Sequence, residues 1–173
     1  MKKILSISII VFVFSAVLFF QSCSKDKNTD PQTTEYVADN NTFTNFMSWP
    51  LESTKQGADP FLGTAHAGND ATVVREVYFK NGEDPVNGKY PVGTIVVKHS
   101  YNPDKTINEF TGMVKRGNNF NPEFGNWEFF MLTPTGSIAT DASGMAMRGA
   151  SLMGGMCAGC HTGASNKDFI FSK

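Results

Sequence analysis

The sequence predicts a mainly β domain of the α+β class, built on an antiparallel sheet of about four to five strands. An N-terminal helix is expected before the sheet, and a C-terminal segment carrying a Cys-x-x-Cys-His motif after it. Short runs of β-branched and aromatic residues recur along the chain, and the connections between them are short enough to favour antiparallel neighbours. Turn signals such as Asn81-Gly82 and Asn87-Gly88 separate the runs.

The expected elements follow one another along the chain. Thr34–Trp49 places apolar residues at a loosely helical period and ends at Pro50, so a helix is expected there. Four strands are then expected, at Ala71–Phe79, Thr94–His99, Asn108–Lys115 and Asn126–Leu132. The stretch from Ser143 onward is rich in Gly, Ser and Met, has weak helical character and leads into the C-terminal motif.

The start of the chain has the layout of a secretory signal over residues 1–22, with a short basic region followed by a long apolar run. Cys23 and the Ser-Lys-Asp that follows it resemble a lipoprotein start of the Bacteroidetes type, in which the cysteine sulfur takes diacylglycerol. We therefore expect lipidation at Cys23, a polar tether over residues 23–34, and a domain over residues 35–173. The protein would be exported and lipid-anchored to a bacterial membrane, in the periplasm or on the outer surface. The apolar run is also long enough for an uncleaved membrane-spanning helix, which would leave the domain outside the cytoplasm as well.

Charge and length limit the other possibilities. Fifteen Lys and Arg residues against sixteen Asp and Glu residues give a net charge of -1. Nucleic acids attract strongly basic surfaces, so no nucleic-acid partner is expected. About 150 residues remain after the signal segment, which is enough for one compact domain.

Cysteine usage indicates a covalent haem. With Cys23 assigned to the lipid, the remaining cysteines are Cys157 and Cys160, and His161 follows directly. Cys-x-x-Cys-His is the signature of c-type haem attachment. Each thiol adds to one vinyl group of the haem, and the adjacent imidazole becomes the proximal iron ligand. One covalent haem c, ligated by His161, is therefore expected, and export agrees with it because bacterial haem c is attached outside the cytoplasmic membrane.

The same motif has other readings. A thioredoxin-like redox pair would need the motif at a helix start within a βαβ unit, and too little chain follows Cys160 for that fold. A zinc site needs four ligands, of which Cys157, Cys160 and His161 would supply three, and no second Cys/His pair completes the usual spacing. Five residues are also a short pattern that can occur by chance.

A sixth iron ligand is a separate question. Four methionines crowd just before the motif, namely Met145, Met147, Met153 and Met156. Methionine is the usual sixth ligand of electron carriers, but flexible methionines also fill gaps around a large group, and we favour that role. An aromatic cap over the haem could come from Phe43, Phe46, Phe61 or Phe79, among which no spacing selects.

Several longer stretches match one known family in the right order. Tyr90–Lys98 reads Tyr-Pro-Val-Gly-Thr-Ile-Val-Val-Lys, Met113–Gly117 reads Met-Val-Lys-Arg-Gly, and Gly125–Phe130 reads Gly-Asn-Trp-Glu-Phe-Phe. Together with the Cys157-x-x-Cys160-His161 motif and Lys167–Phe171, they resemble the cytochrome P460 family. The resemblance covers most of Phe61–Phe171.

The resemblance implies a β-rich domain, usually a homodimer, with a five-coordinate haem c held by histidine. In one group of the family a strand lysine is linked covalently to the porphyrin edge, and hydroxylamine is oxidised at the iron. In the related cytochrome c′-beta group the link is absent, aromatic side chains cap the distal face, and nitric oxide binding is the expected role. The implied partners are hydroxylamine or nitric oxide, a redox partner such as another cytochrome, and a second copy of the chain.

Two residues carry the catalytic expectation. By its place in the matching strand Lys98 is the candidate for the cross-linking lysine, and a lysine in an apolar strand is costly to bury unless it is paired, neutral or covalently consumed. Its alternative is a solvated strand face. Arg75 matches a family position that places a guanidinium over the distal pocket, where it would hydrogen-bond a bound ligand. Its alternative is a surface strand arginine.

Two histidines complete the candidates. His99 stands where the family pattern leads us to expect an acid after the lysine, and it could replace that acid in proton transfer or lie on the surface. His66 lies in a Gly-rich stretch and is expected to be structural. Three functions stay open: a hydroxylamine-oxidising haem enzyme, a nitric oxide or gas binder, and, less favoured, a His/Met electron-transfer cytochrome.

Overall fold

The computed structural model describes residues 35–58 and 71–171 of the 173-residue chain. These residues belong to one compact unit, Thr33–Lys173. The expected signal segment and tether, Cys23, Phe61 and His66 lie outside the described residues. In the part of the chain that is described, no helix combines the length and the apolar character needed to cross a membrane.

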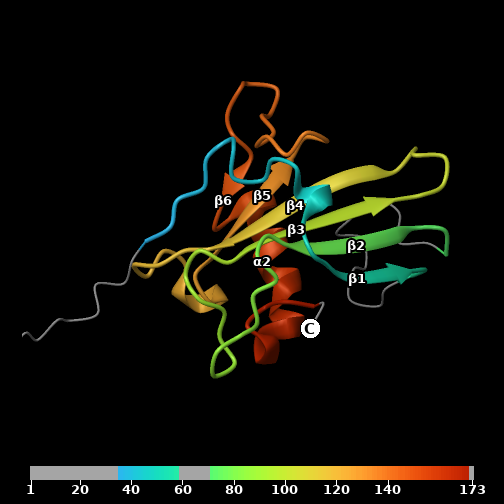
Figure 1. Cartoon of the computed structure of the whole chain (residues 1–173). Coiled ribbons are helices and arrows are strands. Elements are labelled where there is room, and N and C mark those ends of the chain that lie inside the picture. Colours follow the sequence, from blue (N-terminus) through green and yellow to red (C-terminus); the bar gives the residue numbers. More distant parts are fainter. Residues whose placement is uncertain (1–34, 59–70, 172–173) are drawn as a thin grey trace, which may run out of the picture. The chain divides into compact units, whose positions relative to one another are not determined.

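Six antiparallel strands form one sheet, in which each strand pairs with its neighbour in sequence. They are β1 (Leu51–Gln56), β2 (Val74–Phe79), β3 (Ile95–Tyr101), β4 (Asn108–Lys115), β5 (Trp127–Leu132) and β6 (Arg148–Gly149), and Figure 1 shows them side by side in that order. The mainly β class and all four expected strands are confirmed. Two strands were missed: β1 is a polar, almost wholly exposed edge strand, and β6 has only two residues.

The expected N-terminal helix is not formed. Residues 40–45 are turns, and the one helical element before the sheet in the described residues is the 3-10 turn η1 (Phe46–Ser48). Side chains compete with the backbone here, because the Asp39 and Asn41 amides donate to the Thr42 hydroxyl and to the Asp39 carboxylate at 2.8 and 2.9 Å. Ala38, Phe43 and Phe46 of this segment are nevertheless buried against the sheet, whereas Val37 and Met47 are exposed.

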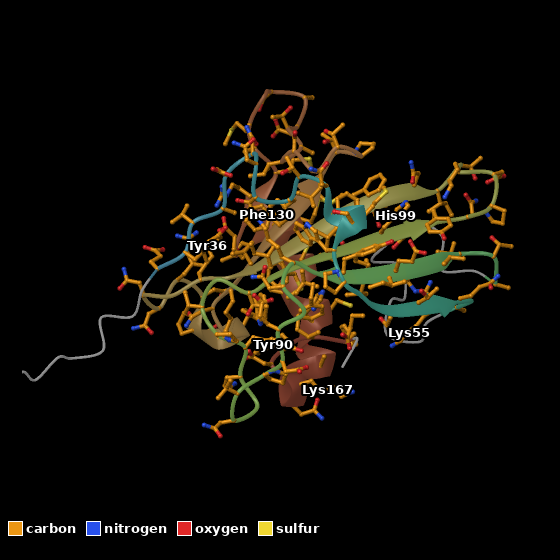
Figure 2. The ribbon with its side chains drawn as sticks, in the orientation of Figure 1. Tyr36, Lys55, Tyr90, His99, Phe130 and Lys167 are labelled. Atoms are coloured by element: carbon orange, nitrogen blue, oxygen red, sulfur yellow. The ribbon has the colours of Figure 1, made fainter. Side chains whose placement is uncertain are left out.

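Two hydrophobic clusters cover the two faces of the sheet, because successive side chains of a strand point to opposite faces. The N-terminal segment packs on the face that we call the N-face, whose cluster comprises Ala38, Phe43, Phe46, Tyr78, Ile95, Val97, Phe110, Val114, Phe130 and Leu132. The C-terminal segment packs on the opposite C-face, whose cluster comprises Phe79, Tyr90, Val96, Met113, Trp127, Phe129, Ala158, Phe169 and Ile170. Figure 2 shows His99 and Phe130 on the first side of the sheet and Tyr90 on the second.

The C-terminal segment is a chain of short helical elements: η3 (Leu152–Gly155), α2 (Met156–His161) and η4 (Thr162–Lys167). A further 3-10 turn, η2 (Pro122–Phe124), lies between β4 and β5. Figure 1 shows α2 against the sheet, and Ala158 in its middle is 2 % exposed. The sheet and α2 therefore bring the Cys-x-x-Cys-His motif against the C-face.

Candidate functional site

A single cavity joins the C-face to the motif. It is lined by side chains of β1 to β5, of α2 and of the two residues Ile170 and Phe171, and its empty volume, open mouth included, is about 950 Å³. All five residues that the sequence singled out for haem and catalysis line it: Arg75, Lys98, Cys157, Cys160 and His161. Segments more than 80 residues apart in the chain thus meet at one site.

The short helix α2 presents both cysteines to this cavity. Cys157 and Cys160 are three residues apart, so they lie on the same side of a helical turn. Neither forms a disulfide. Burial raises the pKa of the Cys157 thiol, an effect that the nearby Lys98 partly opposes. Burial beside the apolar cavity therefore favours the neutral form of the Cys157 thiol.

His161 is oriented by a backbone carbonyl. Its Nδ1 lies 2.7 Å from the Phe169 carbonyl oxygen, and because a carbonyl only accepts, Nδ1 carries the proton and Nε2 carries the lone pair. Its ring lies between the rings of Phe129 and Phe171, with centroids 5.4 and 5.3 Å away. A neutral imidazole with its Nδ1–H bonded to a carbonyl is the usual state of a metal-binding histidine.

Cross-strand pairing orders side chains of the C-face into three rows, whose members line the cavity with the exceptions of Ser100 and Glu109. The ligand row contains Val96, Met113 and Phe129, the lysine row contains Val77, Lys98 and Thr111, and the arginine row contains Lys55, Arg75, Ser100 and Glu109. Rows two residues apart along a strand are separated by about 7 Å. Because Phe129 contacts the His161 ring, the rows lead from His161 past Lys98 to Arg75.

Lys98 is half-buried in the middle row. Burial lowers the pKa of its ammonium below the usual 10.5, with Glu109 opposing and Arg75 adding to the shift. The cysteines also hold this pKa up slightly, and that contribution disappears when thiols become thioethers. The environment therefore favours a neutral, nucleophilic amine more than a solvated strand face would.

Arg75 is buried at the far end of the cavity, with 6 % of its surface exposed. Its Nη2 donates to the Gly57 carbonyl. Its Nε and Nη1, and the Ser100 hydroxyl next to it in the arginine row, have no hydrogen-bond partner among the described residues. Buried donors of this kind are costly unless a ligand or water satisfies them, so the surface-arginine alternative is wrong.

Glu109 is a site residue that the sequence reasoning missed. It pairs with Ser100 in the arginine row, and its charge is the largest single influence that favours the protonated form of Lys98. The signal was available in the alternation of the Asn108–Lys115 strand, since Glu109, Thr111 and Met113 share one face. The sequence did not indicate which face of the sheet packs against the Cys-x-x-Cys-His motif.

His99 lies away from the cavity. Its ring stacks on Phe110 of the N-face at 4.4 Å, and its Nε2 lies 2.8 Å from the Asn108 side-chain oxygen. The suggestion that His99 moves protons at the site is therefore wrong. The reason is the two-residue period of a strand, which sends Lys98 and His99 to opposite faces.

The four methionines, favoured as gap fillers around the haem and less favoured as ligands, do not line the cavity, and neither do the described candidates for an aromatic cap. None of the four methionines before the motif lines it, and Met145, Met153 and Met156 are about half exposed or more, at 69 %, 53 % and 49 %. The methionine that does line it is Met113, in the same row as Phe129 and so on the His161 side. Phe43 and Phe46 belong to the N-face cluster, whereas the aromatic lining is Phe129, Phe130 and Phe171.

The residues present fit a haem. Two thiols and an imidazole whose Nδ1–H is bonded to a carbonyl line one largely apolar cavity, as cofactor sites require. The buried, partnerless Arg75 donors lie in the same cavity. Zinc gains no support, because in the described residues no three His, Cys, Asp or Glu side chains gather as a metal-binding group.

Comparison with known proteins adds the family. A family model described as Cytochrome P460 matches residues 44–172 of the chain. No curated protein and no solved structure matches it.

Proposed function

The chain belongs to the cytochrome P460 family of haem proteins, and we propose that it is a mono-haem c protein that oxidises hydroxylamine at a five-coordinate haem. The observation that carries the proposal is one cavity in which Cys157, Cys160 and His161 are joined by Lys98 and Arg75. An electron carrier would need only the first three. A lysine with a lowered pKa and an arginine with unused donors support chemistry on a small polar ligand.

When bound, a haem supplies an iron that exchanges electrons and leaves one position open to a small ligand. In this proposal Cys157 and Cys160 hold it through thioether bonds, and His161 ligates it through Nε2. The Nδ1–H of His161 would still donate to the Phe169 carbonyl, and this hydrogen bond keeps the ring in one orientation. The apolar residues of the ligand row exclude water from this side.

Lys98 and Arg75 have different tasks in the proposal. Lys98, in the row between His161 and Arg75, supplies an amine of lowered pKa that could bond to the porphyrin edge, with loss of one N–H and one porphyrin C–H hydrogen and transfer of two electrons to the redox partner. Arg75 orients hydroxylamine with its free Nε–H and Nη1–H, and these donors stabilise negative charge that develops on the bound ligand. Oxidation of hydroxylamine releases electrons and protons together: the electrons pass to a redox partner such as another cytochrome, and Glu109, in the same row as Arg75, is the candidate to accept protons.

A second candidate function is nitric oxide binding without turnover. The lining favours it in one respect, since Val77, Val96, Phe129, Phe130 and Phe171 make most of the cavity apolar, which suits a small uncharged gas. In that case the Lys98 link would be absent. Electron transfer with methionine ligation is the weakest candidate, because the methionines just before the motif do not line the cavity and Met113, which does, lies on the His161 side.

The test is the spectrum of the purified ferrous holoprotein together with its intact mass and its turnover of hydroxylamine with an artificial electron acceptor. A strongly red-shifted Soret band, a mass below the simple haem adduct by the hydrogens that a cross-link removes, and turnover would support the enzyme. An ordinary high-spin haem c spectrum without turnover would favour the gas binder. A Cys157→Ser/Cys160→Ser protein is the control for thioether attachment: acidified acetone should extract its haem if the thioethers are the sole covalent bonds, and should fail to do so if Lys98 is also linked.

We also propose that the protein is exported, lipid-anchored through Cys23 and homodimeric. The basic and apolar start of the chain and the Cys-Ser-Lys-Asp sequence support the anchor. The exposed edge strand β1, which pairs with β2 on one side only within the described sheet, offers a surface for a second copy.

A further inference from the structure

Two consecutive residues behind His161 have an unusual backbone. Asp168 and Phe169 both have positive φ, 50° and 69°, and neither is glycine. For residues with a side chain this left-handed region is unfavourable, and consecutive examples are rare. Such a conformation persists only where the surroundings hold it in place.

The Asp168 side chain is the first element that holds it. The residue is 1 % exposed, and its Oδ2 accepts the Tyr90 amide at 2.8 Å and the Lys115 ammonium at 2.6 Å. Lys115 is itself buried, with 7 % exposed. Because the Tyr90 amide and the Lys115 ammonium both donate to it, the Asp168 carboxylate is fixed in position.

The backbone is held from two further sides. The Trp127 indole N–H donates to the Asp168 carbonyl oxygen at 2.7 Å, and Trp127 is fully buried. Gly125 lies against both residues: a Cβ there would stand 2.9 Å from the Asp168 Oδ1 and 2.9 Å from the Phe169 Cδ2. Only a glycine allows this approach. Both Gly125 and Trp127 of the Gly-Asn-Trp sequence therefore contact the Asp168–Phe169 backbone or its side chains.

This arrangement positions the hydrogen-bond acceptor of His161. The carbonyl of Phe169, whose direction follows from the backbone of these two residues, is the acceptor of the His161 Nδ1–H at 2.7 Å. A hydrogen bond at this nitrogen raises the basicity of the other one and fixes the ring plane. The strength of the bond therefore depends on contacts made by residues that do not touch the histidine.

We propose that Asp168 is a positioning residue for the haem ligand: its buried contacts with Lys115 and Tyr90, with Trp127 on its carbonyl, hold the Phe169 carbonyl against His161 and set how strongly His161 donates to iron. The inference rests on His161 being the haem ligand and not on the reaction with hydroxylamine. A purely structural ion pair would affect the free energy of unfolding and nothing at the haem.

The experiment uses three holoproteins. Asp168→Asn removes the charge that Lys115 pairs with, and Trp127→Phe removes one hydrogen bond to the Asp168 carbonyl while keeping an aromatic ring and the ion pair. Lys89→Gln is the matched control, because Lys89 approaches Asp168 from solvent at 3.5 Å with 66 % of its side chain exposed. The iron–histidine stretching band of the ferrous protein and the haem reduction potential are measured for each.

In both test variants the stretching band should move to lower frequency and the reduction potential should rise, because a weaker hydrogen bond makes His161 a poorer donor. Lys89→Gln should leave both at the wild-type values. If Trp127→Phe and Asp168→Asn hold haem with an unchanged band and potential, even at reduced stability, the proposal is wrong. Trp127→Phe gives the answer alone if Asp168→Asn does not take up haem. A wild-type protein that carries haem but ignores hydroxylamine would contradict the proposed reaction and leave this test intact.

Discussion

Lys98 and His99 are neighbours in the chain, yet their side chains lie on opposite faces of the sheet. Lys98 lines the cavity that contains the Cys-x-x-Cys-His motif, whereas the His99 ring stacks on Phe110 with centroids 4.4 Å apart. A substitution at each position therefore tests a different property of the protein, the haem site in one case and the stability of the fold in the other.

Replacement of Lys98 tests the proposed porphyrin link. A Lys98→Met protein should have the mass of its own chain plus one haem, without the deficit that a cross-link causes. Its Soret band should move to an ordinary haem c position, because the amine that forms the bond is gone. Mass spectrometry and the ferrous spectrum measure both. A Lys98→Met protein with the wild-type mass deficit would show that another residue forms the link.

Replacement of Arg75 tests ligand orientation. Arg75→Gln removes a buried cation with two available N–H donors, and charge-assisted hydrogen bonds of this kind contribute roughly 1.5–3 kcal/mol, so ligand affinity should fall about tenfold or more. Spectrophotometric titration of the holoprotein with hydroxylamine or nitric oxide measures the affinity. Lys105→Gln, which removes one exposed charge far along the β3–β4 loop, should leave the affinity unchanged; equal affinities for Arg75→Gln and wild type would remove Arg75 from the site.

The pH dependence of stability contains a contribution from His99. Burial lowers the pKa of His99 below its usual 6.5, against the opposing effects of Asn108 and Glu76. The unfolded chain therefore takes up this proton more readily than the fold does. The stabilisation from neutral His99 is complete above pH 6.5, declines as the pH falls below that value, and is lost once the pH passes the lower pKa of the folded state.

His99→Gln cannot titrate, so its free energy of unfolding should decrease less than that of the wild type between neutral pH and about pH 5. Urea unfolding at a series of pH values measures the difference. The haem spectrum should stay unchanged, because the ring lies on the face away from the cavity. A spectrum that changes with His99→Gln would contradict the assignment of the two faces.

A buried ion cluster on the N-face side should dominate stability. Glu128, 3 % exposed, accepts from Arg116 Nη1 at 2.6 Å and from Arg148 Nε at 2.7 Å. Removal of one member of a buried pair leaves the other charge uncompensated and costs roughly 3–5 kcal/mol, so Glu128→Gln should lower the free energy of unfolding by that order. Glu123→Gln, at an exposed position of η2, should change it little. Similar denaturation midpoints for both variants would contradict the importance of the cluster.

Replacement of Cys23 tests the membrane anchor. Cys23→Ala should move the protein from the membrane fraction to the soluble fraction and should leave haem content unchanged, because Cys23 is not part of the Cys157-x-x-Cys160-His161 motif. Fractionation and mass spectrometry measure both. A Cys23→Ala protein that remains in the membrane fraction would favour an uncleaved apolar anchor over the lipid.

Much of the sheet could be predicted because its signals are local. The Asn108–Lys115 strand has the predicted bounds, and the other three expected strands begin or end within a few residues of the observed ones. Periodicity failed where local contacts competed with it: Phe43 and Phe46 have helical spacing, but hydrogen bonds of Asp39, Asn41 and Thr42 hold that stretch in turns. β1 could not be predicted, because its residues are polar and pair only through their backbone.

The haem motif and its family could be identified from the chain alone, since covalent attachment needs two cysteines and a histidine at fixed spacing, and that spacing is itself a sequence property. The partners of the motif could not. Glu109 lies in the same row as Arg75, whereas His99 lies on the opposite face of the sheet from Lys98. Asp168 holds the carbonyl that accepts from His161 through contacts with residues 40 or more positions away, such as Trp127 at 41 and Lys115 at 53. Face, burial and hydrogen-bond partners depend on which strands pair and which side meets the C-terminal segment, and these follow from long-range packing that no local pattern contains.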